Sequence, residues 1–131
     1  MKKTILYEEH VKKGAKIIPF SGFLMPVQYE GINVEHLHVR SNVGLFDVSH
    51  MGEFFLKGEN ATNLLQLICT NDISKISDGK AQYNCMTDEN GGIIDDLIVY
   101  KFNEKEYMLV VNAGNIEKNW NWIKLQNKKY N

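Results

Sequence analysis

The sequence is poor in cysteine and proline, with two residues of each, and it has neither a long hydrophobic run nor an excess of one charge. Two cysteines are too few for the disulfide framework of a small secreted domain. No apolar stretch approaches the roughly 20 residues that a membrane-spanning helix needs. Fifteen basic residues nearly balance sixteen acidic ones, which argues against nucleic-acid binding by bulk electrostatics. We expect a soluble, cytoplasmic protein without membrane or nucleic-acid partners.

Histidines and cysteines do not form a metal-binding pattern. The four histidines are scattered over the first 50 residues, and His36 and His38 are two residues apart on an expected helix, so they face different directions. Cys69 and Cys85 lack the spacing of metal ligands, and burial as small hydrophobic residues explains them better. The sequence therefore predicts no metal site.

The first part of the chain, residues 1–51, is expected to be a segment of helices and loops. Two helical patterns, residues 4–13 and 33–43, each stop at a glycine, which is common at helix ends. Thr4 is the expected N-cap of the first helix. The segment PFSGFLMP, residues 19–26, offers turn residues without a helical or strand period, and it predicts an ordered loop.

The second part, residues 52–131, predicts an antiparallel sheet with helices packed on it, and thus an α+β fold class. The expected strands are 52–58, 80–86, 92–102 and 106–112, and the expected helices are 60–68 and 115–127. Short, turn-like links join the last three strands, so we expect a three-stranded meander beside the earlier strand. A helix after a meander usually leads to a further strand. We therefore expect the sheet and its helices to be incomplete without downstream chain.

The most informative stretch is the strand 92–102, which carries two adjacent acidic residues among apolar ones. Because side chains alternate along a strand, Asp95 and Asp96 point to opposite faces. Both faces are otherwise apolar, which predicts a central strand that is covered on both sides. A buried carboxylate without a partner is costly. Each Asp therefore needs a capping interaction, a solvent cavity or a ligand.

The turns predict which residues face each other across the sheet. With residues 103–105 as one turn, Asp96 lies opposite Asn112, and with residues 88–91 as the other, Asp96 lies opposite Tyr83. Cross-strand neighbours share a face, so a phenol, a carboxylate and an amide would form a row on an apolar wall, which suits a flat heteroaromatic ligand. The three residues are equally consistent with a structural hydrogen-bond network. A one-residue slip of register would separate them.

Several segments resemble the N-terminal part of the aminomethyltransferase family, the tetrahydrofolate-dependent component of the glycine cleavage system. The segments are LYEEHVKKGAKIIPFSGFLMPVQYEGI, VGLFDVSHMGEF, TNDISKISDGKAQYN and NGGIIDDLIVY. The resemblance covers essentially the whole chain in order, and it departs at Phe23 and Gly114, where the family usually has Trp and Ala. Because proteins of the family run well over twice as long, the chain is expected to be an N-terminal fragment.

The resemblance implies a cloverleaf of three domains with folate in the central channel. It implies an enzyme that takes the aminomethyl group from the lipoyl arm of H-protein, releases ammonia, passes the one-carbon unit to tetrahydrofolate and leaves dihydrolipoyl H-protein. Asp96 matches the catalytic carboxylate. Tyr83 and Asn112 match folate-contacting positions, and Met51 and Tyr100 are expected to line the site.

Three further expectations follow from the resemblance and the register. Asp95, on the opposite face from Asp96, is expected to matter for folding more than for chemistry. The fragment alone is expected to bind folate weakly, to catalyse nothing and to be able to self-associate through the exposed face of the helix that carries Trp120. A related folate-dependent demethylase and a non-catalytic folate-binding module, of the kind implicated in iron–sulfur cluster assembly, are the alternative functions. The segment GLFDVSHMGE favours the aminomethyltransferase over the first, and the residues Tyr83, Asp96 and Asn112 argue against the second.

Overall fold

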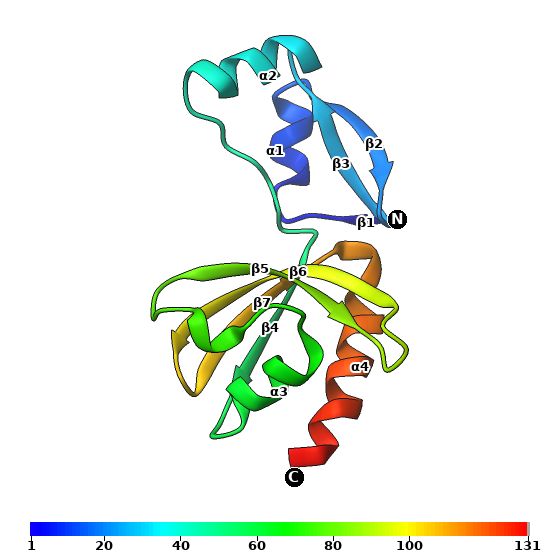
Figure 1. Cartoon of the computed structure of the whole chain (residues 1–131). Coiled ribbons are helices and arrows are strands. Elements are labelled where there is room, and N and C mark those ends of the chain that lie inside the picture. Colours follow the sequence, from blue (N-terminus) through cyan, green and yellow to red (C-terminus); the bar gives the residue numbers. More distant parts are fainter. Residues whose placement is uncertain (131) are drawn as a thin grey trace. The chain divides into compact units, whose positions relative to one another are not determined.

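A computed structural model describes residues 1–130, which form two compact units, one from Met1 to His50 and one that begins at Met51 (Figure 1). Each unit has its own sheet and its own helices. No helix within residues 1–130 combines the length and the apolar character needed to cross a membrane.

The first unit contains a three-stranded sheet in addition to two helices, so the prediction of helices and loops alone is wrong for this part of the chain. Its elements are β1 (Lys2–Lys3), α1 (Tyr7–Lys12), β2 (Lys16–Phe20), β3 (Phe23–Gln28) and α2 (Ile32–Ser41). The strand order is β1-β3-β2, with β1 parallel and β2 antiparallel to β3.

Residues 19–26 belong to a β-hairpin and not to the predicted loop. Ser21 (φ +46°) and Gly22 (φ +83°) both adopt the left-handed conformation that a tight two-residue turn between strands requires. The two prolines that suggested a loop lie within the strands, where a missing N–H is tolerated at an edge. Pro19 lies on the edge strand β2, and β1 pairs only with the first two residues of β3, before Pro26.

The first helix begins three residues later than predicted, and Thr4 does not cap it. The N-cap position is Leu6, without a side-chain cap, whereas the Thr4 hydroxyl donates to Asp47 Oδ2 at 2.8 Å. The helix ends as predicted before Gly14, whose φ of +74° favours glycine.

The second unit is the predicted antiparallel sheet with helices packed on it. Its main elements are β4 (Gly52–Lys57), α3 (Ala61–Ile68), β5 (Ala81–Thr87), β6 (Ile93–Asn103), β7 (Glu106–Val111) and α4 (Ile116–Asn127). Short 3₁₀ turns lie at Ile73–Lys75, Ala113–Asn115 and Lys128–Tyr130. The strand order is β4-β7-β6-β5, with every pair antiparallel. The meander and the earlier strand beside it are confirmed.

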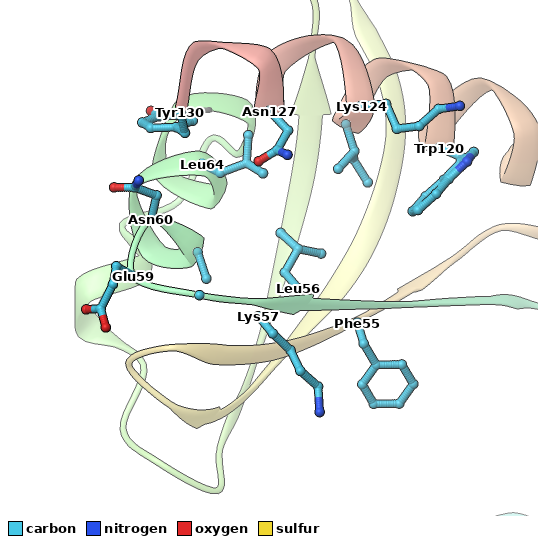
Figure 2. Close-up of a pocket in the computed structure, with 13 residues that line it drawn as sticks. Phe55, Leu56, Lys57, Glu59, Asn60, Leu64, Trp120, Lys124, Asn127 and Tyr130 are labelled. Atoms are coloured by element: carbon cyan, nitrogen blue, oxygen red, sulfur yellow. The ribbon is translucent and has the colours of Figure 1, made fainter.

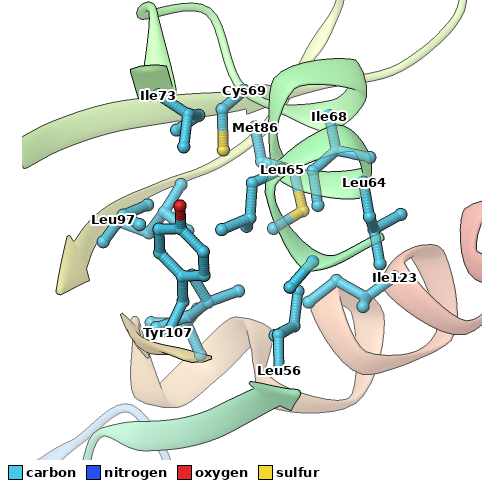
Figure 3. Close-up of a cluster of buried hydrophobic side chains, with 14 of the residues drawn as sticks. Leu56, Leu64, Leu65, Ile68, Cys69, Ile73, Met86, Leu97, Tyr107 and Ile123 are labelled. Atoms are coloured by element: carbon cyan, nitrogen blue, oxygen red, sulfur yellow. The ribbon is translucent and has the colours of Figure 1, made fainter. Parts of the chain in front are cut away.

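One face of this sheet packs against α3 and α4 and forms the core (Figure 3). Alternate residues of the strands point into it, including Leu97, Tyr107 and Leu109, and they meet Leu65 of α3 and Ile123 of α4. This alternation is the period-2 pattern of a sheet that is buried on one side.

The opposite face of β6 is open to solvent, so the prediction that both faces are covered is wrong for the described residues. Asp96 is exposed and Ile98 is 37% exposed, whereas Asp95 and Leu97 on the other face are buried. The strand looked buried on both faces because its open face also carries apolar residues. The sequence alone does not show whether another element packs against them.

The predicted register between β6 and β7 is correct over most of its length, and the one between β5 and β6 is displaced by two residues. Leu97 pairs with Val111, as the turn at 103–105 predicted. Asp96 pairs with Cys85 and not with Tyr83. The connecting loop has five residues instead of four, and a β-bulge adds one further residue next to it.

Candidate functional site

Asp96 lies on the open face of the sheet and receives a hydrogen bond on each carboxylate oxygen. The Tyr83 hydroxyl donates to Oδ2 at 3.1 Å, and Asn112 Nδ2 donates to Oδ1 at 2.8 Å. The direct cross-strand partner of Asp96 is Cys85. Tyr83 lies two residues from Cys85 and therefore on the same face, so its hydroxyl reaches Asp96 diagonally. The structure thus brings together the three residues that the sequence placed in one row.

Tyr83 acts as the donor in its bond to Asp96. The hydrogen bond to Asp96 and the charge of that carboxylate both raise the pKa of the Tyr83 phenol. The hydroxyl therefore keeps its proton at neutral pH, and it holds the carboxylate oxygen from one side while the Asn112 amide holds the other.

Beside these polar groups the open face of the sheet carries a group of apolar side chains, next to the exposed Glu53 that pairs with Val110. We call this surface the apolar platform, and it is made by residues from β4, β6 and β7: Phe55, Ile98, Tyr100, Met108 and Val110. The register sets these side chains in two rows, because Phe55 pairs with Met108, which pairs with Tyr100, and Val110 pairs with Ile98. Phe55 lies on the opposite side of β4 from Leu56 (Figure 2). A flat ring can lie on such a surface with its polar edge toward Asp96.

The two expected lining residues lie at different places on this face. Tyr100 shares the face of Asp96 but lies four residues along β6, at roughly 13 Å from the rise of a strand. Met51 directly precedes β4, whose first residue Gly52 pairs with Val111, next to Asn112. Met51 is therefore at the Asn112 end of the row and Tyr100 is at the platform.

Asp95, on the buried face of β6, is 4% exposed and is surrounded by asparagines. Its carboxylate accepts from Asn112 Nδ2 at 2.9 Å, from the Asn112 backbone N–H at 3.2 Å, from Asn115 Nδ2 at 2.8 Å and from Asn119 Nδ2 at 2.5 Å. Burial by itself would raise the pKa of Asp95, but the bonds from Asn112, Asn119 and Asn115 outweigh it and lower the pKa below its usual range. Asp95 is therefore ionised at neutral pH.

Asn115 and Asn119 were not predicted to take part in any site. Asn115 does occupy the N-cap position of α4, as expected, but its side chain makes no capping bond and turns to Asp95 instead. Residues four apart lie on one helix face, so the asparagines at 115 and 119 formed a polar stripe that could have indicated a buried partner.

A second polar cluster lies in the first unit. The side chains of His10 and Asp47 are both buried, and they are 2.8 Å apart between Nε2 and Oδ2. The other ring nitrogen of His10 is 2.7 Å from the Tyr29 hydroxyl, and the Ser49 backbone N–H donates to Asp47 Oδ1 at 2.9 Å. The pKa of Asp47 is shifted well below its usual range: burial acts to raise it, and the bonds from His10, Ser49 and Thr4 lower it by more.

The second unit also has a hollow of about 330 Å³ between β4, α3 and α4 (Figure 2). Leu56, Leu64 and Ile123 form its floor, and Trp120 and Tyr130 are among its other lining residues. It lies on the helix side of the sheet, away from Asp96. Among residues 1–130 there is no group of three or more side chains arranged to hold a metal ion.

Comparison with known proteins gives consistent results. Residues 6–131 match the family described as the GCVT N-terminal domain. The chain is 62% identical over 127 residues to the aminomethyltransferase of Flavobacterium psychrophilum, which covers 97% of this chain and 35% of that protein. It is 56% identical over 123 residues to the aminomethyltransferase of Chlorobium phaeobacteroides, which covers 94% of this chain and 34% of that protein.

A solved structure is similar to this chain in both fold and sequence. The crystal structure of the glycine cleavage system aminomethyltransferase T from Bartonella henselae superposes with a TM-score of 0.91 at 38% identity, over 96% of this chain and 35% of that one. The chain thus spans about a third of the length of the relatives that it matches.

Proposed function

The chain belongs to the family of GCVT N-terminal domains, and from this membership we propose that it is the N-terminal part of a tetrahydrofolate-dependent aminomethyltransferase of the glycine cleavage system. The observation that carries the proposal is the environment of Asp96. Its carboxylate has one donor on each oxygen, from Tyr83 and Asn112, and it stands at the border of the apolar platform.

The side chains on this face fit a reduced pterin. The pyrimidine ring of the pterin is flat, so Ile98 and Tyr100 on the platform can contact its face. Its edge carries N–H groups, for which the Asp96 carboxylate is a suitable acceptor. Tetrahydrofolate, when bound, supplies the nitrogen that receives the one-carbon unit. In this proposal Tyr83, Asn112 and Met51 line the polar end of the site.

The role of Asp96 follows from what a fixed carboxylate does. It can orient an amine by accepting a hydrogen bond, take the proton that the amine loses on attack, and stabilise positive charge that develops on the carbon being transferred. Tyr83 and Asn112 restrict its rotation, because each bonds a different oxygen. A carboxylate that is oriented in advance loses less free energy when the reacting groups bind.

The rest of the reaction needs more protein than this chain. Since the chain spans about a third of its relatives, we assign to the remaining two-thirds the groups that close the open face over the ligand. The aminomethyl group would arrive on the lipoyl arm of H-protein, and ammonia and dihydrolipoyl H-protein would leave. We also propose that the reaction takes place in the cytoplasm.

The test uses a full-length protein in which this chain is followed by the remaining two-thirds of the Flavobacterium psychrophilum relative. We expect it to form methylenetetrahydrofolate from aminomethyl-loaded H-protein. Asp96→Asn should reduce turnover by at least ~100-fold, the usual scale for a general acid–base group, with little change in tetrahydrofolate binding. Glu117→Gln, which removes an exposed acid on α4, is the matched control and should have no effect.

Other outcomes would favour the alternatives. Turnover of methylamine or methylthio donors without H-protein would indicate a demethylase. Binding of tetrahydrofolate with no turnover of any donor would indicate a binding module. Near-normal turnover in the Asp96→Asn protein would contradict the role of this carboxylate, whatever the donor.

A further inference from the structure

We propose that Asp95 is a positioning residue for Asp96: it fixes the side-chain amide of Asn112 so that an N–H, and not the carbonyl oxygen, faces the Asp96 carboxylate. The inference rests on the function proposed above for Asp96. It concerns a residue on the opposite face of β6, which touches neither the apolar platform nor the open surface.

The geometry of Asn112 carries the first step. Its Nδ2 is 2.9 Å from Asp95 Oδ1 and 2.8 Å from Asp96 Oδ1. A primary amide has two N–H bonds on one nitrogen, so one can point to each carboxylate. Rotation of the amide by 180° would place its carbonyl oxygen against both carboxylates, without a proton between them. The two carboxylates, together with the Asp96 backbone carbonyl 3.2 Å from Nδ2, therefore select one orientation.

The second step is that Asp95 is buried and held by donors on both of its oxygens. It is 4% exposed, and its two oxygens also accept from Asn115 and Asn119 of α4, at 2.8 Å and 2.5 Å. The bond to the Asn112 backbone N–H, at 3.2 Å, fixes the same residue through its main chain. Since these donors are neutral amides, the negative charge of Asp95 is not cancelled by a cation. It is a constant acceptor for the Asn112 amide.

Asp96, in contrast to Asp95, is exposed, and its carboxylate has fewer donors. Its Oδ1 depends on Asn112, and its Oδ2 depends on Tyr83. If the amide of Asn112 could rotate freely, Asp96 would lose one of its two donors for part of the time, and the plane of its carboxylate would be less well fixed. Small errors in the placement of a reacting group reduce rates strongly.

The experiment compares Asp95→Asn with Asn115→Ala. Asp95→Asn keeps the shape of the side chain but replaces one acceptor oxygen by a donor, so Asn112 can turn its carbonyl oxygen toward residue 95. Asn115→Ala removes a bond to Asp95 of similar length but leaves Asn112 untouched. Both variants should lose stability. Only the first should release the amide of Asn112.

The first measurement is NMR of the side-chain amide of Asn112 in this chain. In the unsubstituted chain we expect two separate proton signals, both protected from exchange with water. Asn115→Ala should keep them, and Asp95→Asn should lose the protection. If the unsubstituted chain already shows freely exchanging signals, the proposal is wrong, and this result does not depend on whether any variant folds.

The second measurement is steady-state kinetics in the full-length protein described above. Asp95→Asn should lower kcat on the order of 10-fold, less than the direct loss of Asp96, with the KM for tetrahydrofolate changed by less than about 2-fold. Asn115→Ala, which leaves Asp95 bonded to Asn112 and Asn119, should lower kcat by a smaller factor than Asp95→Asn does. Equal losses of kcat in the two variants would overturn the positioning role. A protein that lacks activity even without substitution would refute the proposed function but leave the NMR test of Asp95 intact.

Discussion

Asn112 Nδ2 donates to both members of the acidic pair, at 2.9 Å to Asp95 and 2.8 Å to Asp96. Adjacent residues of a strand point to opposite faces, so one side chain rarely reaches both. Asn112 can do so because β7 ends at Val111, and the amide lies at the end of the sheet, where no strand separates the two faces. The buried network around Asp95 and the open site around Asp96 therefore share one residue.

Loss of Asn119 should destabilise the second unit. Asn119 is fully buried, and its amide donates to Asp95. Asn119→Ala leaves the carboxylate with fewer donors, and we expect the free energy of unfolding to fall by about 1–3 kcal/mol. Urea unfolding followed by tryptophan fluorescence measures the change. Asn121→Ala, an exposed position on the same helix, is the control, and an equal loss there would contradict the assigned role.

The stability of the second unit should fall in acid because of Asp95. Its folded-state pKa is lowered: burial alone would raise it, but the bonds from Asn112, Asn119 and Asn115 prevail. A carboxylate with a lowered pKa stabilises the folded state above its unfolded pKa of about 3.9, and that contribution is lost as the pH falls through the folded value. Unfolding measured between about pH 7 and pH 2.5 should show the decline. Asp95→Asn should have lower stability at neutral pH and a shallower decline, and an unchanged slope would argue against an ionised Asp95.

The sequence predicted the row of Tyr83, Asp96 and Asn112 although one of its two registers was displaced. The longer loop after Thr87 contributes one residue of displacement, and the bulge at Ile94 contributes the other. Because the two add to an even number, Tyr83 stays on the same face as Asp96. The five-residue loop without the bulge would have shifted the register by one residue and placed Tyr83 on the buried face. The agreement therefore depends on alternation and not on the exact pairing.

Other features could not be predicted because they depend on contacts between distant parts of the chain. Asn115 and Asn119 form a polar stripe on α4, but only the packing of α4 against β6 shows that their partner is Asp95. The hairpin at residues 16–28 was hidden because its prolines are typical of loops, and only the pairing of the strands shows that they lie where the lost N–H is tolerated. Local sequence signals predict turns and helix caps. Contacts between residues that are distant in the sequence can be identified only once the fold is known.

The hairpin turn of the first unit provides a prediction that depends on backbone conformation alone. Gly22 has a φ of +83°, and a Cβ added there would meet no atom within 4 Å. The substitution Gly22→Ala therefore tests strain without steric overlap. We expect a loss of about 1 kcal/mol in the free energy of unfolding of this unit, the usual cost of the left-handed conformation for alanine. Gly22→Asn, which tolerates this conformation better, is the control and should lose less in the same urea titration.

Asp47 should fix the conformation of residues 42–50, the segment between α2 and the end of the first unit. It accepts from Thr4 and Ser49 and lies 2.8 Å from His10 Nε2, although residues 42–50 form no helix or strand. Asp47→Asn keeps the size of the side chain but loses the charge, and it should weaken these bonds by about 1–3 kcal/mol in total. Hydrogen exchange of residues 42–50 and of α1 should become faster. Unchanged exchange in both would mean that the carboxylate does not fix this segment.

The hydroxyl of Tyr83 should matter for turnover and not for folding. Tyr83 is 59% exposed, so Tyr83→Phe removes the 3.1 Å bond to Asp96 Oδ2 while it changes little buried surface. In the full-length protein we expect kcat to fall by roughly 10-fold, because the Asp96 carboxylate loses one of its two donors and is less well oriented. The melting temperature should not change. Phe102→Leu, an exposed aromatic position on the same strand as Asp96 but near the distant turn, is the control for a general effect of altered aromatic surface. If Tyr83→Phe retains full turnover, Asn112 alone is sufficient to orient Asp96, and the hydrogen bond from Tyr83 is not needed for the reaction.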